Sequence, residues 1–394
     1  MPPDKEEFAR RVTLLARYLS TKGLDTALIR YPLNIFYFTG AFIDGHLVIT
    51  QKAETFLLVY RTLGRPDLKP FGKVIPFRSF KKLPDFLSEL GIKIIGLEED
   101  RLPLSQYRRY QKLLSAFELG DLGEIIKKIR AIKSPYEINC LKKAAEKLSD
   151  AIWNFLPRLK PGQSELEAAG LLEAELRKRG YPAFTRTYGF GQELAYGHLL
   201  SGKSGVIPAY VTTGQGGQGV YGFPQGPSEK KIKANELILI DYAGWHEGYM
   251  IDQSRLFYFG EIPEKAVEIY AKVLLLLNEL ENFLRPGTSV RELYETAFNK
   301  AKELGISDYF MAHGPEKVPF VGHGVGLEID EWPPIASLDI PLEENMVIAL
   351  EPKCHVPEIG LVGIEDTYWI TKDGAERLTS FPRKLINLES ISMT

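Results

Sequence analysis

Five residues in the last two-fifths of the chain form a ligand set for divalent metal ions: Asp241, Asp252, His323, Glu351 and Glu365. Four carboxylates and one imidazole give a mostly hard oxygen shell, which suits Mn, Co, Fe or Zn better than copper or iron–sulfur chemistry. Two ions that share such ligands lie roughly 3.5–4 Å apart and activate a common water. The set therefore predicts a dinuclear hydrolytic centre. For any one residue alone, the simpler interpretation is an unrelated acid or a core histidine.

Strand-like segments must position these side chains. Residues 236–260, ELILIDYAGWHEGYMIDQSRLFYFG, read as two strands joined by a turn at His246, which brings Asp241 and Asp252 side by side. The two glutamates lie in the apolar runs VIALEPKC and LVGIEDTYW. An acid in a buried strand is costly unless it is paired or bound to metal. The histidine is presented by VGHGVGLEIDEWPP, where glycines let the backbone pass close to other groups.

The order and context of these residues resemble the pita-bread metallopeptidase family, which includes Xaa-Pro dipeptidases, aminopeptidase P, methionine aminopeptidase and the metal-free creatinase. The resemblance rests on IDYAG, GYMIDQSRLF, GHGVGLE, LEPK and GIEDT, and it covers nearly the whole chain. It implies that Asp252 and Glu365 bridge the ions, that Asp241 holds one ion and that His323 holds the other. It also implies that Glu351 is a ligand that helps to deprotonate the bridging water.

The resemblance implies a metal-dependent hydrolase of the Xaa-Pro dipeptidase or aminopeptidase P type, which attacks the scissile amide with a hydroxide shared by two metal ions. Three departures from the family pattern keep alternatives open: Pro319, Asp330 and Gly363 stand where the family carries His, His and Arg. The alternatives are a hydrolase or lyase acting on a small non-peptide substrate, and a metal-binding homologue that is not a peptidase. Because Gly363 removes a cation, we also expect a more negative site that favours a small or cationic substrate.

Two residues are candidates for substrate binding. His198, in AYGHLLSG, lies just before the phrase in which the family places a substrate histidine, and a structural histidine is the alternative. Asp330 could bind a substrate ammonium group, hold a third cation, stay protonated beside the metals, orient another residue or serve as a turn or cap residue. His246, His313 and His355 are weaker candidates.

The glycine-rich segment GQGGQG, residues 214–219, is no phosphate loop, because no Lys-Ser/Thr pair follows it. It predicts a mobile flap near the substrate.

The chain of 394 residues exceeds the usual size of a single core, which favours two domains. By resemblance, residues 1–125 form an α/β creatinase-like N-terminal domain and residues 126–394 an α+β pita-bread catalytic domain. Ser134, Pro135 and Glu137 predict the start of the first catalytic helix. The segments KPGQSELEAAGLLEAELRKRG and RPGTSVRELYETAFNKAKELG repeat at an offset of 125 (286 − 161). This repeat favours halves duplicated about a pseudo-two-fold axis; two independent capping boxes are the alternative.

Composition limits the classes of partner. A hydrophobic fraction of 44%, a charged fraction of 25% and a net charge of −2 are typical of a soluble globular protein without attraction to nucleic acid or membrane. The charged N-terminus argues against a signal peptide, and no apolar run is long enough to span a bilayer. Only Cys140 and Cys354 are present, which excludes a disulfide framework and favours the cytoplasm. The expected partner is a short peptide or small-molecule substrate, and the resemblance implies a homodimer. His46 and its acidic neighbours read as solvated turn residues.

Overall fold

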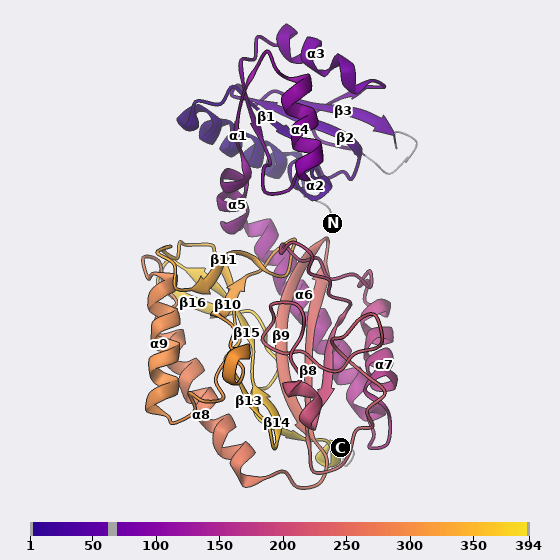
Figure 1. The fold of residues 1–394 in the computed structure, drawn as a ribbon, viewed down its shortest axis with the longest axis vertical. Helices are drawn as coiled ribbons and strands as arrows, with labels where there is room; N and C mark the ends of the chain where they lie inside the picture. The colour runs from indigo at the N-terminus through magenta and orange to yellow at the C-terminus, as the bar shows by residue number, and fades with distance from the viewer. Residues whose placement is uncertain (1–2, 62–68, 392–394) are drawn as a thin grey trace. The chain divides into compact units, whose positions relative to one another are not determined.

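The structure is a computed structural model that describes residues 3–61 and 69–391 (Figure 1). The chain divides into two compact units, Met1–Arg130 and Ala131–Thr394. Among the described residues, no helix combines the length and apolarity needed to cross a membrane.

The first unit is built on one mixed sheet of six strands in the order β4-β3-β2-β1-β5-β6. Strands β1, β2 and β3 pair antiparallel, whereas β3–β4, β1–β5 and β5–β6 pair parallel. The strands are β1 (Thr26–Ile29), β2 (Asp44–Thr50), β3 (Thr55–Arg61), β4 (Lys73–Pro76), β5 (Ile94–Leu97) and β6 (Glu118–Asp121), and the helices are α1 (Lys5–Lys22), α2 (Pro32–Thr39), α3 (Leu83–Glu89), α4 (Leu104–Leu113) and α5 (Gly123–Ala131). This alternation of strands and helices is the α/β architecture predicted for the N-terminal part.

His46 is buried within this sheet, so its prediction as a solvated turn residue is wrong. It lies on β2, which is paired on both sides, and only 1% of its surface is exposed. Its Nδ1 atom lies 3.0 Å from the Tyr60 hydroxyl, and its Nε2 atom hydrogen-bonds with the hydroxyl of Tyr110 from α4. Burial, aided by the nearby Arg30 charge, lowers the pKa of His46 to about 3.

The buried His46 should make the N-terminal sheet sensitive to acid. Its folded pKa lies below the unfolded value, so its contribution to stability is present above pH 6.5 and is lost as pH falls toward 3. Between pH 7.5 and 5, we expect the free energy of opening of β2 to fall by about 2 kcal/mol more in the wild type than in His46→Gln. Amide hydrogen exchange of the β2 residues measures this difference. An equal fall in both proteins would contradict it.

The second unit contains three antiparallel arrays and a short parallel edge. The sheets are β17-β9-β8-β7, β11-β10-β12-β15-β16 and the pair β13-β14. Among the strands of residues 131–391, only β17 runs parallel to its neighbour. The strands are β7 (Gly197–Ser201), β8 (Leu237–His246), β9 (Tyr249–Tyr258), β10 (Phe320–Gly324), β11 (Glu331–Ala336), β12 (Val347–Leu350), β13 (Lys353–Val356), β14 (Gly360–Gly363), β15 (Asp366–Thr371), β16 (Gly374–Arg377) and β17 (Ile386–Asn387). A bridge between Ser254 and Glu365 joins the β9 and β15 sheets.

Four long helices flank these sheets. They are α6 (Pro135–Phe155), α7 (Glu165–Lys178), α8 (Glu264–Glu281) and α9 (Val290–Glu303). Helices α6 and α7 pack on the β7–β9 side, and α8 and α9 pack on the β10, β11 and β14 side, so the strands lie between the two helix pairs (Figure 1). The predicted start of α6 is confirmed: Ser134 accepts from Glu137 N, and the Glu137 carboxylate accepts from Ser134 N.

The two halves of this unit repeat each other in their backbone contacts as well as in their helices. The amides of Gly162, Glu165 and Leu166 donate to the carbonyls of Ile232, Lys230 and Ser228, and those of Gly287, Val290 and Arg291 donate to Leu342, Ile340 and Leu338. All three donors are shifted by 125 (287 − 162) and all three acceptors by 110 (342 − 232). Two unrelated capping boxes would not share both offsets, so duplication explains the repeat. The difference of 15 residues (125 − 110) is extra chain in the first half, on the stretch that carries the glycine-rich segment.

Candidate functional site

All five predicted ligands line one cavity of about 240 Å³ in the second unit. Asp241 lies on β8 and Asp252 on β9, and the hairpin between these strands sets the two acids on one face because Asp252 pairs with Ala243. His323 lies on β10, Glu351 directly follows β12, and Glu365 directly precedes β15. Residues separated by up to 124 positions (365 − 241) therefore meet at one point.

Three of these residues form a compact cluster around the His323 ring. Ligand atoms of Asp252, His323 and Glu365 all lie within 4.8 Å of one another. The Nε2 atom of His323 lies 3.8 Å from Glu365 Oε1, 4.0 Å from Asp252 Oδ2 and 3.5 Å from Glu351 Oε1. Glu365 Oε1 is buried and has no hydrogen-bond partner among the described residues. A buried oxygen without a donor, beside a histidine and further carboxylates, fits a divalent cation at this position.

The cluster holds more negative charge than a buried site tolerates without a cation. Burial, followed by the neighbouring Asp241 carboxylate, raises the pKa of Asp252 well above its usual range. Burial and the charge of Asp252 do the same to the pKa of Glu365. Metal ligands must be deprotonated to bind, so a bound cation would favour the charged form of both acids.

Lys353, which was not predicted, supplies a positive charge to the site. Its side chain is completely buried, and its Nζ atom lies 2.9 Å from Asp241 Oδ2, 2.7 Å from Glu351 Oε2 and 3.3 Å from Glu365 Oε2. Burial lowers the pKa of Lys353, but the three carboxylates outweigh it and hold the pKa well above the usual value. A lysine inside the apolar run VIALEPKC was the signal that could have revealed it.

Lys353 also corrects the expectation for Gly363. Across the β13–β14 pair Lys353 stands directly opposite Gly363, and a Cβ atom at Gly363 would lie 2.5 Å from Lys353 Cγ. The glycine therefore makes room for a cation from the facing strand. Lys353 supplies the positive charge whose loss at Gly363 led to the expectation of a more negative site, so the inference of a cationic substrate loses its basis.

Gln215, from the glycine-rich segment, is a second residue that was not predicted. Its Nε2 atom donates to Asp241 Oδ2 at 2.8 Å and lies 3.2 Å from His198 Nδ1, while its Oε1 atom accepts from Lys353 Nζ at 2.6 Å. The preceding Gly214 permits this close approach, because a Cβ atom there would lie 2.5 Å from Glu351 Oε2. Residues 214–217 are all buried, so this part of the predicted flap packs against the site.

His198 lines the cavity next to Asp241. It lies on β7 directly opposite Asp241 on β8 and is 2% exposed. Its Nδ1 atom faces the Gln215 amide, and its Nε2 atom is buried without a hydrogen-bond partner among the described residues. Burial lowers the pKa of His198 to about 4, so the ring is neutral at pH 7. With Nδ1 accepting from Gln215, the proton lies on Nε2, which is available as a donor.

Asp330 also lines the cavity, but its carboxylate is bound to backbone. Its Oδ1 atom accepts from Tyr188 N and its Oδ2 atom from Gly189 N at 3.2 Å. Asp330 therefore holds the loop that includes Thr187, a further lining residue.

The remaining histidines of the second unit stand outside the cavity lining. His355 is buried, and its Nε2 atom lies 2.7 Å from the Gly214 carbonyl oxygen. This contact helps to fix the position of the adjacent Gln215. His246 lies 3.0 Å from Lys147 Nζ, and the exposed His313 lies 3.3 Å from the Asp308 carbonyl.

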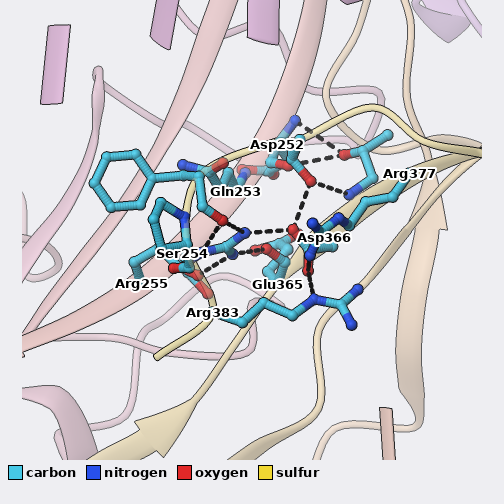
Figure 2. Close-up of polar contacts among 12 residues, drawn as sticks. Asp252, Gln253, Ser254, Arg255, Glu365, Asp366, Arg377 and Arg383 are labelled. Carbon is cyan, nitrogen blue, oxygen red and sulfur yellow. Dashed lines mark hydrogen bonds and ion pairs between the residues drawn. The ribbon is translucent and has the colours of Figure 1, made fainter. Parts of the chain in front are cut away.

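The buried ion pair between Arg255 and Asp366 links the two segments that carry Asp252 and Glu365. Figure 2 shows the Arg255 guanidinium between these segments: it donates to the carbonyls of Ser254 at 2.8 Å and Glu365 at 2.6 Å. The same group pairs with Asp366 Oδ1 at 2.5 Å, and both side chains are 0% exposed. Thr379 and Arg383 occupy the other acceptor positions of Asp366. The spacing between the two acids is thus set by a network outside the cavity lining.

Comparison with known proteins agrees with this architecture. Residues 139–372 match metallopeptidase family M24, and residues 11–132 match the Creatinase/Prolidase N-terminal domain. The Xaa-Pro dipeptidase of Pyrococcus horikoshii is 31% identical over 382 residues, which cover 95% of this chain and 98% of that protein. The Xaa-Pro dipeptidase of Pyrococcus furiosus is 30% identical, over 95% of this chain and 99% of that protein.

Solved structures give the same result. The prolidase from Pyrococcus horikoshii superposes with a TM-score of 0.77 at 29% identity, and covers 96% of this chain and 100% of that chain. An Xaa-Pro dipeptidase from Bacillus anthracis has a TM-score of 0.80 at 26% identity, with 96% and 99% covered. The predicted fold class, a creatinase-type α/β domain and an α+β pita-bread domain with duplicated halves, is confirmed. The chain belongs to metallopeptidase family M24 and carries a Creatinase/Prolidase N-terminal domain ahead of the catalytic domain.

Proposed function

We propose that this protein is a metal-dependent peptidase of the Xaa-Pro type that hydrolyses short peptides. The observation that carries the proposal is the cluster of Asp252, His323 and Glu365, in which one buried oxygen has no partner among the described residues. Two relatives that match over 95% of this chain are Xaa-Pro dipeptidases. A cavity of about 240 Å³ has room for only a few residues of a peptide. The relatives favour a peptide over the small non-peptide substrate that the missing family histidines left open.

The proposal gives each side chain a task. Asp252, His323, Glu351 and Glu365 would hold a divalent ion, which supplies Lewis-acid activation of a water molecule and of the scissile carbonyl. Glu351 Oε2 is engaged by Lys353, whereas Oε1 faces His323 and is the atom that would accept a proton. The predicted pair of ions, with Asp241 as a further ligand, remains a prediction. Asp330 would act on the substrate through the loop that it holds.

His198 is the proposed donor to the negative charge that develops on the carbonyl oxygen. The His198 side chain lines the cavity, and its Nε2 atom is buried without a hydrogen-bond partner among the described residues. A donor directed at the developing charge stabilises the transition state more than the ground state. We expect His198→Ala to lower kcat/KM by about 10²–10³-fold. Steady-state kinetics with a proline dipeptide measure the effect, and the exposed His313→Ala is the matched control. A His198→Ala variant within twofold of the wild type would exclude this role.

The function itself is tested with purified protein loaded separately with Mn, Co, Fe or Zn. We expect hydrolysis of Xaa-Pro dipeptides, loss of activity with a chelator and recovery when metal is restored. Dipeptides of the same length without proline are the matched substrates and should be cleaved less. No turnover of any Xaa-Pro peptide with any of the four metals would refute the proposal.

Further proposals follow from the sequence. We propose a cytoplasmic protein with no nucleic acid or membrane partner, which the net charge of −2 and the two buried free cysteines support. We also propose a homodimer, which is what the family resemblance implies. We propose that the N-terminal domain comprises residues 1–125 and the catalytic domain residues 126–394.

A further inference from the structure

The ammonium group of Lys353 is surrounded by oxygen atoms as a bound metal ion would be. Three carboxylate oxygens and the Gln215 amide oxygen lie 2.6–3.3 Å from Nζ. An ammonium has three hydrogens to donate, so four oxygen neighbours exceed what hydrogen bonding alone requires. The Lys353 side chain is fully buried, so its charge interacts with the carboxylates of the site and not with solvent.

The carboxylates divide their oxygens between two cation positions. Glu351 turns Oε2 toward Lys353 at 2.7 Å and Oε1 toward His323 at 3.5 Å. Glu365 does the same, with Oε2 at 3.3 Å from Lys353 and Oε1 at 3.8 Å from His323. Asp241 faces Lys353, and Asp252 faces His323. Acids that bridge two cations have this arrangement. Here the Lys353 ammonium is one of the two cations, and the other position lies beside His323.

The duplicated halves provide an internal comparison. Strands β8 and β12 begin at the same offset of 110 (347 − 237), so Asp241 matches Glu351 and Ala243 matches Lys353. Ala243 and Lys353 both line the cavity. The alanine ends at its methyl group, whereas the lysine side chain extends to Asp241. The lysine is therefore not a requirement of the repeated fold, because the matching position holds a small residue.

Space for Lys353 depends on the residues around it. Gly363 lies opposite Lys353 on β14, and any side chain at Gly363 would collide with Lys353 Cγ. A Cβ atom at Gly214 would lie 3.2 Å from Lys353 Cδ. Glycines thus border the lysine stem where it passes two backbone segments, and Gln215 binds its end.

We propose that the chain binds one divalent ion, held by Asp252, His323, Glu351 and Glu365, instead of the pair of ions predicted from the sequence. The Lys353 ammonium takes the place of the second ion beside Asp241. This inference rests on the proposed function for the presence of the first ion. A cation bound to Asp241 Oδ2, Glu351 Oε2 and Glu365 Oε2 at normal metal–oxygen distances would overlap Nζ. The lysine also removes the electrostatic need for that ion, because it neutralises one of the acids that would bind it.

The number of ions per chain tests this inference directly. Full-length wild type, Lys353→Ala and the matched control Lys142→Ala are each saturated with Mn²⁺, dialysed and analysed for metal and protein. Lys142 is part-exposed and pairs with Glu376 at 2.7 Å outside the cavity lining. We expect one Mn²⁺ in the wild type and the control, and two in Lys353→Ala, whose two ions should show the exchange-coupled paramagnetic resonance signal of a close pair.

Each outcome has a definite meaning. Two ions in the wild type, or a single ion in a folded Lys353→Ala, would overturn the role of the lysine and leave the peptidase function standing. A wild type that binds no ion with any of the four metals would overturn the proposed function together with this inference. If Lys353→Ala does not fold, the wild-type ratio decides alone: one ion supports the inference and two ions overturn it.

Discussion

Asp252→Ala is expected to abolish tight metal binding and to lower kcat/KM by at least about 10³-fold, because a bound ion contributes several kcal/mol of transition-state stabilisation. Asp252 Oδ2 belongs to the cluster with His323 and Glu365, and its backbone is fixed by the Thr367 hydroxyl at 2.8 Å and 3.3 Å. The substitution therefore removes one of three clustered ligands while the strand keeps its pairing. Metal analysis and peptide hydrolysis on the same preparation measure both effects.

The control for this variant is Asp150→Ala, which removes an exposed carboxylate from α6 in the same unit. It should keep the metal content and activity of the wild type. If Asp252→Ala retained the wild-type metal content after dialysis, Asp252 would not be a ligand. Glu365→Ala should reproduce the loss, because its unpartnered Oε1 atom belongs to the same cluster.

Arg255→Met should destabilise the catalytic unit by about 3–5 kcal/mol, which is the usual result of removing one partner of a buried ion pair. The guanidinium is 0% exposed, pairs with Asp366 and holds the carbonyls of Ser254 and Glu365. Methionine keeps much of the volume but leaves Asp366 with only Thr379 and the arginines Arg377 and Arg383 as partners. Urea unfolding of the full chain gives the change in free energy.

A double variant separates the lost charge from the lost packing. Arg255→Met combined with Asp366→Leu should recover part of the stability, because the buried carboxylate that has lost its Arg255 partner is then absent. A single Arg255→Met variant that unfolds at the wild-type urea concentration would contradict the structural role of the pair. Since the pair also sets the position of Glu365, we expect the single variant to bind Mn²⁺ more weakly.

Much of the fold could be predicted because its signals are local in the sequence. The α6 start depends on Ser134 and Glu137, three positions apart, and the repeat shows itself as two matching segments. The β8–β9 hairpin needs only two strand-like runs and a short turn. Positions of the candidate ligands followed from motifs, and the structure brings all five to one cavity.

The parts that were missed depend on contacts between distant segments. Lys353 is two residues after Glu351, yet its direction is set by pairing with Gly363 and by Gln215, which is 138 positions away. Arg255 could not be assigned from sequence, because its partner Asp366 lies 111 positions along the chain. His46 looked exposed because Asp44 and Gly45 precede it as a turn would, whereas the strands on both sides and α4 bury it.

Anomalous diffraction at the manganese edge, from crystals of the Mn²⁺-loaded protein, would locate the metal in the cavity. We expect an anomalous peak within coordination distance of His323 Nε2, Asp252 Oδ2 and Glu365 Oε1, the three atoms that converge in this structure. A Mn²⁺-saturated crystal with no anomalous peak in this cavity would contradict it.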